Sequence, residues 1–187
     1  MTEPIKDDVV DLLTRQHNEI RSLFIKVTQA GGKEKREFFA DLVWLLAVHE
    51  ATEGEVVHPM ARKEIDDGDE VIEHRLEEEQ DAKEALAELH DLGVDHPEFR
   101  TKLLALAEAI AAHATYEEDE EFRFLRERVP PGLLQEMAGA VEAAQARVPN
   151  RERVEADKST DATPADAPLA IFEHVHDAVR EWRLRDR

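Results

Sequence analysis

The feature that most constrains the fold of this chain is the spacing of its apolar residues, which recur every three and four positions. Only 7 glycines and 8 prolines interrupt the 187 residues. This spacing places apolar side chains along one face of an α-helix, and the alternation of apolar and polar residues that marks a half-buried strand is absent. The sequence therefore predicts an all-α fold. Roughly 150 residues are enough for such helices to bury a core without disulfides or other cross-links.

The helical segments predict an up-down-up-down four-helix bundle with a short fifth helix, together forming a domain over residues 1–148. Glycine and proline pairs and an Asp-rich turn mark the ends of these segments. Pro59 falls inside the second segment, where it is expected to kink the last turns. The five expected helices cover about residues 7–30, 33–64, 70–92, 98–128 and 133–147.

The chain beyond the bundle changes composition. Residues 149–168 are rich in Asp, Ala, Thr and Pro, which is typical of a flexible linker. Residues 169–187 then place Phe172, Val175, Val179 and Trp182 on one stripe of a short amphipathic helix. This tethered helix needs a surface to dock on, either the bundle or another subunit, and the second option would make the protein a homo-oligomer.

Composition excludes several classes of site and partner. The chain has no cysteine, which excludes disulfides, thiolate zinc sites, iron–sulfur clusters and a cysteine nucleophile. The net charge of −20 opposes binding to nucleic acid or to anionic lipid. No signal-peptide pattern opens the sequence and no run of 18 apolar residues occurs, so we expect neither secretion nor membrane insertion but a cytoplasmic protein.

Polar residues interrupt the apolar stripes in two similar segments. LAVHEATEGEVV, from Leu46, and IAAHATYEEDEEF, from Ile110, both contain a histidine followed four positions later by a glutamate. A spacing of four brings the two side chains onto one face of a helix, one turn apart, where they can bind the same metal or adjacent metals. The pairs are His49 with Glu53 and His113 with Glu117. In antiparallel packing they can face each other, and His17 enters the same layer from the first helix.

Each of these features has a simpler explanation when taken alone. Acidic helices contain HxxxE by chance, as in His74 and Glu78, which are expected to face solvent opposite Leu76. A histidine on an apolar stripe is more often a hydrogen-bonded core residue than a ligand. Three such histidines on different helices, two of them with inward glutamates that are costly to bury unpaired, favour a metal site instead.

The order of these segments resembles a known family. A lone histidine in LTRQHNEIRSLF, then HEATEGEVVHP, then HATYEEDEEFRFL is similar to the hemerythrin-like HHE cation-binding domain, over residues 7 to about 148. The resemblance implies a bundle around two non-haem iron ions joined by an oxo or hydroxo bridge. The matching ligand positions are His17, His49, Glu53, His113 and Glu117, with Glu53 and Glu117 as bridging carboxylates. Ferritin-like di-iron proteins instead use an ExxH motif, which this chain does not show at these sites.

The third helix departs from this pattern. Hemerythrins place two histidines four residues apart there, whereas this chain has RLEEEQDAKEAL. At 100° per residue, Glu79 lies at the centre of the stripe and Gln80 at its edge, so Glu79 is the predicted substitute ligand and Gln80 the alternative. An anionic oxygen in place of imidazole favours the more oxidised iron and would also accept manganese.

The positions of the other polar residues predict lesser roles for them. Tyr116 is expected to pack as an ordinary amphipathic residue, although contact with a ligand, ligation itself and an interface role stay open. His58, Glu50 and Glu118 point away from the ligand direction and are expected on the surface or behind the ligands.

The functional hypothesis follows from the ligand types. Histidines and carboxylates totalling five or six leave an open coordination position, at which dioxygen, peroxide or nitric oxide can bind. The leading hypothesis is therefore a di-iron protein that binds or senses one of these, with weak peroxide-decomposing activity. The alternatives are a metal-buffering or interaction bundle, and a di-iron oxidase of an organic substrate, which would need an apolar channel beside Glu79. No nicotinamide, flavin or phosphate-binding motif is present.

Overall fold

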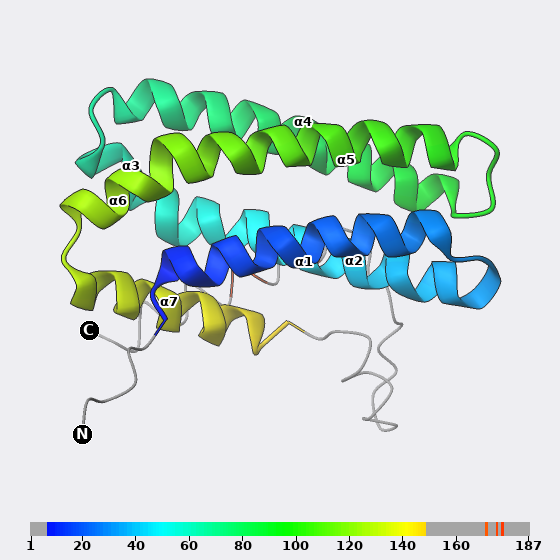
Figure 1. Cartoon of the computed structure of the whole chain (residues 1–187), viewed down its shortest axis with the longest axis horizontal. Helices are drawn as coiled ribbons and strands as arrows, with labels where there is room; N and C mark the ends of the chain where they lie inside the picture. Colours follow the sequence, from blue (N-terminus) through cyan, green and yellow to red (C-terminus); the bar gives the residue numbers. More distant parts are fainter. Residues whose placement is uncertain (1–6, 149–170, 172–174, 176, 178–187) are drawn as a thin grey trace.

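The computed structural model of the protein describes residues 7–148 together with residues 171, 175 and 177. Four long helices lie side by side in it (Figure 1), and no strand occurs among the described residues. The prediction of an all-α bundle is confirmed. The long helices are α1 (Val9–Gln29), α2 (Gly32–Thr52), α4 (Gly68–Leu92) and α5 (Phe99–Tyr116).

Two of the long helices continue through a π-helical turn. After α2 come η1 (Glu53–Val57) and α3 (His58–Glu64), and after α5 come η2 (Glu117–Phe122) and α6 (Arg123–Arg128). Each π turn begins at the glutamate of an HxxxE pair. A π turn holds one residue more than an α turn, so the side chains that follow it point in a new direction. The sequence predicted the ends at 64 and 128 but not these turns. Pro59, expected to kink the last turns of this segment, lies in the first turn of α3, directly after the π turn η1.

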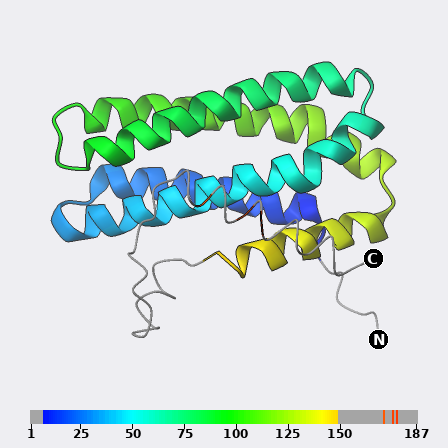
Figure 2. The same ribbon diagram turned by 180° about the vertical axis from the view of Figure 1, so that it is seen from behind.

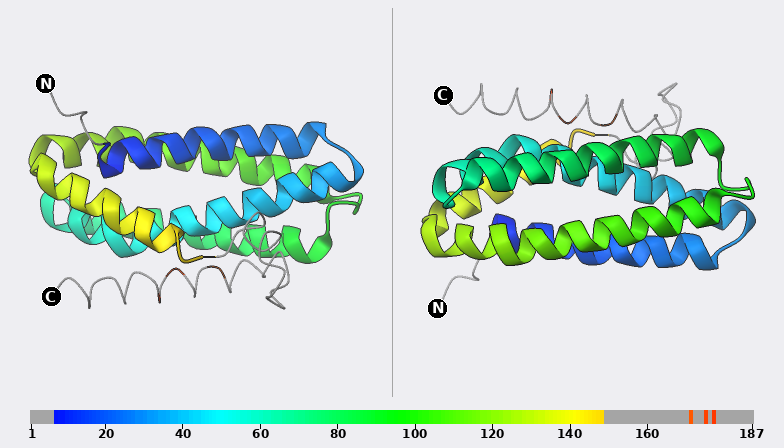
Figure 3. Two further views of the ribbon diagram at one scale, coloured as in Figure 1. Left: turned by 90° about the horizontal axis from the view of Figure 1, so that it is seen from below. Right: turned by 90° about the horizontal axis from the view of Figure 1, so that it is seen from above.

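The packing order is that of an up-down-up-down bundle. α1 contacts α2 and α5, and α4 contacts the same two helices, so the four surround a common interior. The same arrangement is seen from behind in Figure 2. The fifth helix, α7 (Pro131–Gln145), packs against α1 at the end of the bundle where α3 and α6 lie (Figure 3).

Local signals set the helix ends. Asp8 accepts a hydrogen bond from the amide of Asp11, whose carboxylate accepts one from the amide of Asp8, so both free amides at the start of α1 are satisfied. α4 ends at Gly93, which has a φ of 78° that L side chains rarely adopt. At the start of α4, a Cβ on Gly68 would lie 2.7 Å from the carbonyl oxygen of Arg62, so only glycine fits there.

Two apolar clusters fill the interior, one on either side of a polar layer. Along α1 the order is Leu13, then His17, then Ile20. α4 makes the same change from one cluster to the other, and so do α2 and α5 together with the helical turns that continue them. The first cluster holds Phe39, Leu86, Phe99 and Leu103, among others, and the second holds Leu13, Ile72, Phe122 and Leu125. The polar layer is therefore enclosed by apolar packing at both ends.

Little of the C-terminal region belongs to the described residues. Ile171 and Val175 are buried and join the first apolar cluster, as do Ala144 and Val148. These two side chains thus pack on the bundle itself. The predicted linker (149–168) and the rest of the predicted helix (169–187) lie outside the described residues, and the domain boundaries stay predictions. Within the described part of the chain, every helix is too short or too polar to span a bilayer.

Candidate metal centre

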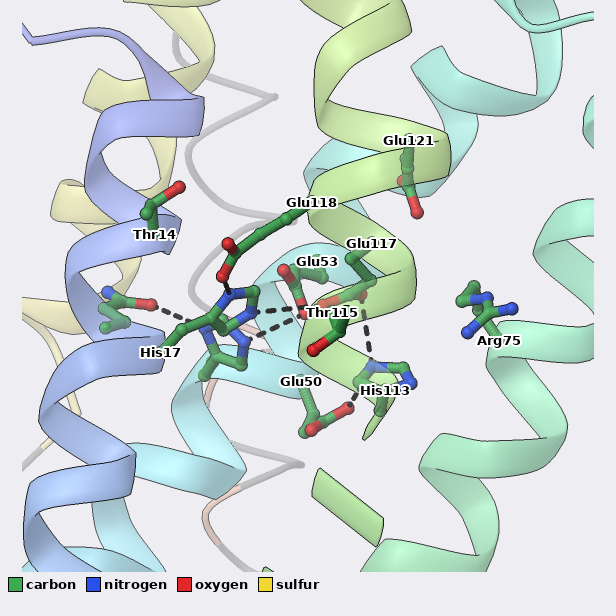
Figure 4. Close-up of polar contacts among 12 residues, drawn as sticks. Thr14, His17, Glu50, Glu53, Arg75, His113, Thr115, Glu117, Glu118 and Glu121 are labelled. Carbon is green, nitrogen blue, oxygen red and sulfur yellow. Dashed lines mark hydrogen bonds and ion pairs between the residues drawn. The ribbon is translucent and has the colours of Figure 1, made fainter. Parts of the chain in front are cut away.

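Histidine and glutamate side chains from four directions meet in the polar layer of the bundle. α1 brings His17, α2 and η1 bring His49 and Glu53, and α5 and η2 bring His113 and Glu117 (Figure 4). Glu79 approaches from α4. All six residues predicted from the sequence therefore reach one layer. Five are buried, and the Glu79 side chain is 12% exposed.

Four of these residues form a compact group. His17, His49, Glu53 and Glu117 each offer one ligand atom, and these atoms all lie within 4.8 Å of one another. Glu53 Oε2 is 3.3 Å from His49 Nε2, and Glu117 Oε2 is 3.2 Å from His17 Nε2. The HxxxE spacing thus places the imidazole of His49 and the carboxylate of Glu53 side by side, as predicted.

Glu117 lies between two histidines of different helices. Its Oε2 is 3.2 Å from His17 Nε2 and its Oε1 is 3.2 Å from His113 Nε2. Burial acts to raise the pKa of Glu117, but the charge of His113 and the close contacts with both histidines hold it well below its usual range. One carboxylate oxygen is thus directed to each side of the layer, the geometry that a bridging carboxylate requires.

The other side of the layer holds a second collection of ligand atoms. His113, Glu50 and Glu79 form one group within 4.8 Å, and His58, Glu79 and Glu117 form another. Glu50 Oε2 is 3.9 Å from His113 Nε2, and His58 Nε2 contacts Glu79 Oε1. Glu79 belongs to both of these groups, so their ligand atoms form a single region. Glu117 joins this region to the compact group of His17, His49 and Glu53.

Glu50 and His58 correct the sequence interpretation, since both are buried inside the layer. α2 contacts both α1 and α4, so His49 can face His17 while the next residue, Glu50, faces His113. His58 follows the π turn η1, whose extra residue rotates it inward. Glu121, in η2, is likewise fully buried. The sequence feature that could have indicated the π turn η1 is Gly54 with Val56 and Val57, since glycine and β-branched residues are poor α-helix formers.

Each histidine of the layer has its Nδ1 bound, which turns Nε2 toward the centre. The four bonds are 2.8 Å from His17 to Glu118, 2.8 Å from His49 to Gln16, 2.9 Å from His113 to Glu78 and 3.1 Å from His58 to Glu121. Such bonds fix the tautomer and the ring orientation of a histidine ligand. The prediction that Glu78 faces solvent was therefore wrong, because it binds His113. His74, at 61% exposure, does face solvent.

Two arginines hold the carboxylates behind these histidines. Arg75 donates to Glu78 at 2.6 Å, and Arg21 donates to Glu118 at 3.5 Å. Arg75 is buried and its guanidinium lies 5.0 Å from the ring of Tyr116. Tyr116 itself is 48% exposed and packs against that guanidinium.

On α4, the sequence predicts an inward stripe of Ile72, Leu76, Lys83, Leu86 and His90, and the observed buried face is rotated from it by about one residue. The structure buries Ile72, Arg75, Ala82, Leu86 and Leu89. Gln80, the alternative to Glu79, is exposed and donates to Glu84 at 2.8 Å. Glu79 is the residue of this pair that faces the layer.

The buried polar atoms of the layer fit a metal cation. Within residues 7–148, no hydrogen-bond partner satisfies Nε2 of His17 or His113, or either carboxylate oxygen of Glu50, Glu53 or Glu117. Burying such groups unpaired costs several kcal/mol each, by order of magnitude. A cation would satisfy them together. Nitrogen and oxygen ligands without sulfur suit iron and manganese.

Protonation within the layer reflects its burial and its surplus of carboxylates. Burial, together with the charge of neighbouring carboxylates, raises the pKa of Glu50 to about 8 and that of Glu53 well above its usual range. Burial acts to lower the pKa of His113 and His58, yet adjacent carboxylates raise these values to about 11 and about 10. Burial and the nearby His17 lower the pKa of His49, so this imidazole is neutral, as ligation requires.

Comparisons with known proteins agree with this geometry. The sequence profile of the hemerythrin HHE cation-binding domain matches residues 8–125. The crystal structure of a hemerythrin HHE cation-binding domain-containing protein from Mycobacterium kansasii has the same fold. It aligns with a TM-score of 0.70 and 18% identity over 90% of this chain and 99% of that chain. A protein from Nostoc sp. named a DNA nickase is 24% identical over 145 residues. The match covers 77% of this chain but only 41% of the Nostoc protein.

Proposed function

This chain belongs to the hemerythrin HHE cation-binding domain family, and we propose that it holds two non-haem iron ions and binds or senses dioxygen, peroxide or nitric oxide. Weak decomposition of peroxide is part of the proposal. The observation that carries it is the set of buried, unpartnered imidazole nitrogens and carboxylate oxygens that converge in one layer of the bundle. The proposed ligands are those predicted from the sequence: His17, His49, Glu53, Glu79, His113 and Glu117.

The charges of the layer support two divalent cations. Glu50, Glu53, Glu79 and Glu117 offer four carboxylates in the groups that can hold a metal. Ionised, they would balance the charge of two divalent ions, while neutral histidines supply the nitrogen ligands. A single ion would be balanced by two of these carboxylates, and the buried oxygens of the other two would be left without a cation to bind.

The protein's own side chains have defined tasks in this proposal. Glu117 faces both sides of the layer and would contact both metals, and Glu53 would be the second bridging carboxylate that the family resemblance implies. The hydrogen bonds at Nδ1 orient the imidazoles of His17, His49 and His113. The apolar clusters on both sides keep bulk water out. When bound, an iron pair supplies reversible electron transfer to a small oxygen or nitrogen species at an open coordination position.

A groove between α4 and α5 gives small molecules a route toward the layer. It has a volume of about 470 Å³, is lined by five alanines together with Leu106, Ile110 and charged side chains, and includes Glu78 and His113. A groove of this kind also supports the second candidate, oxidation of an organic molecule. The two candidates differ in whether they need an organic substrate. An oxidase needs one, whereas binding of dioxygen or nitric oxide and decomposition of peroxide do not.

Reconstitution tests the proposal. Purified protein is loaded with ferrous iron without oxygen, desalted, and then exposed to air or to hydrogen peroxide. We expect two irons per chain and a ligand-to-metal charge-transfer absorption after exposure. Less than one iron per chain, or two irons without any spectral response to air, peroxide or nitric oxide, would contradict it; in the second case metal buffering becomes the better description. Loading with manganese in parallel compares the two metals.

Two further expectations belong to the proposal. We infer a cytoplasmic protein without a nucleic-acid partner, although the Nostoc relative is named a DNA nickase, because a net charge of −20 repels phosphate backbones. Assembly through the C-terminal helix is less favoured than docking on the bundle, since Ile171 and Val175 are buried in the bundle's own cluster. Size-exclusion chromatography of the full chain and of a chain ending at residue 148 separates these options.

A further inference from the structure

The second side of the polar layer contains two potential ligands that the sequence motifs do not include. His58 stands nine residues after His49, outside the HxxxE pair, and Glu50 is the direct neighbour of His49. Both are buried, and each belongs to a group that could hold a metal with Glu79. In a bundle otherwise lined by apolar residues, buried polar groups of this kind need a partner.

The ligands of the layer divide into two sets. The first consists of His17, His49 and Glu53 with one oxygen of Glu117. The second has His113, Glu79 and the other oxygen of Glu117, which is one imidazole fewer than the first. α4 supplies only Glu79 to this second set, because the one charged residue that α4 buries, Arg75, donates to Glu78 and cannot bind a cation.

His58 is placed to make up this difference. Its Nε2 contacts Glu79, and it lies in the same group within 4.8 Å as Glu117. Its Nδ1 is 3.1 Å from Glu121 Oε1, and a bond donated there leaves the Nε2 lone pair free for a metal. This is the arrangement that His17, His49 and His113 also show. Glu50 adds a carboxylate from the adjoining face, 3.9 Å from His113 Nε2, and neither of its oxygens has a hydrogen-bond partner among the described residues.

We propose that His58, through Nε2, and Glu50 are ligands of the second metal, so that α3, which begins directly after the π turn η1, supplies the imidazole that α4 lacks. This inference rests on the proposed function, since it concerns how the second ion is held. The second set then consists of His58, His113, Glu50, Glu79 and shared Glu117, which gives each metal two imidazoles. The second metal has the larger number of carboxylates, which favours its more oxidised state.

The test compares metal content and spectra of His58→Ala with those of the unchanged protein. We expect iron to fall from two per chain to one. The electron paramagnetic resonance spectrum of the oxidised protein should change from the weak signal of a coupled pair to the strong signal of an isolated high-spin ferric ion. His96→Ala, which alters an exposed histidine in the turn between α4 and α5, is the matched control and should keep two irons. Added imidazole should restore the second iron in His58→Ala, because it can occupy the space of the lost ring, whereas a purely structural role of His58 would show no such rescue.

Two further variants separate loss of metal binding from loss of folding. His58→Gln keeps the size and polarity of the side chain, and Glu50→Gln keeps its shape while removing the charge. Both should retain the helical circular dichroism spectrum, with one iron for His58→Gln and at least tenfold weaker binding of the second iron for Glu50→Gln. Two tightly bound, coupled irons in all three variants would overturn this inference and leave the proposed function intact. Absence of iron from the unchanged protein would instead overturn the proposed function and this inference with it.

Discussion

Removal of the metal should reverse the way in which the stability of this protein depends on pH. In the metal-free fold, adjacent carboxylates raise the pKa of His58 to about 10 and of His113 to about 11, from an ordinary value of 6.5. Both side chains are therefore protonated in the folded state and neutral in the unfolded state between pH 7 and pH 9. The stability they contribute is fully present below pH 6.5 and is lost as pH rises through the folded pKa values.

The size of the effect follows from proton linkage. Each such group lowers the free energy of unfolding by about 1.4 kcal/mol per pH unit, so His58 and His113 together give roughly 3 kcal/mol per unit. Glu50, with its pKa raised to about 8, acts in the same direction up to that pH. With a urea dependence of about 1–3 kcal/mol per molar, the midpoint of unfolding should fall by at least about 1 M urea per pH unit.

Urea unfolding followed by circular dichroism at pH 7, 8 and 9 measures this dependence. One series contains a chelator, and the other contains a fixed concentration of free Mn²⁺ or, without oxygen, Fe²⁺. With metal the decline should be much reduced or reversed, because the metal displaces protons from its ligands and binds more tightly as pH rises. His58→Gln should lose about half of the metal-free slope. A metal-free midpoint that stays constant or rises between pH 7 and pH 9 would refute the assignment of charged imidazoles in this layer.

Three further predictions follow from the geometry. Glu117→Gln should weaken binding of both metals in titrations monitored by absorption, because this carboxylate faces both sides of the layer; Glu120→Gln, in the same π turn but half-exposed, should bind two metals normally. Gln16→Leu, which removes the acceptor for Nδ1 of a proposed ligand, should lower the affinity for metal by about 10- to 100-fold while the helical spectrum stays unchanged. Gly68→Ala would place a Cβ 2.7 Å from a backbone oxygen of α3 and should lower the melting temperature by several degrees. Gly139→Ala, at an exposed position of α7 with open space around it, should instead raise the free energy of unfolding by up to about 1 kcal/mol. Calorimetry of both variants checks this pair, and equal melting temperatures would contradict the close approach at Gly68.

Periodicity predicted the bundle because each long helix keeps one apolar face for most of its length. Regular α geometry also located His49 and His113, which lie ahead of the π turns, and it located His17 and Glu79 within the uninterrupted helices α1 and α4. All of these reach the polar layer. The prediction worked where the assumption of a constant rotation per residue is physically valid.

The same assumption explains the residues that were misplaced. His58 lies directly after a π turn, where one extra residue changes the direction of every following side chain. Glu50 was misplaced for another reason, because a helix between two inward-facing neighbours presents a wide face to the interior, not a single line. Glu78 was assigned to solvent from its own helix alone, although His113 of α5 binds it. Which neighbour lies across such a position depends on the packing of the whole bundle, and periodicity within one helix does not contain that information.

The most direct test of the metal centre is anomalous diffraction at the iron and manganese edges from crystals of the protein as isolated. We predict two adjacent peaks within the polar layer, one beside His17 and His49 and the other beside His113, with Glu117 between them. Iron should account for both peaks in iron-grown protein. A single peak, or two peaks outside this layer, would contradict the central claim that these helices enclose a pair of metals.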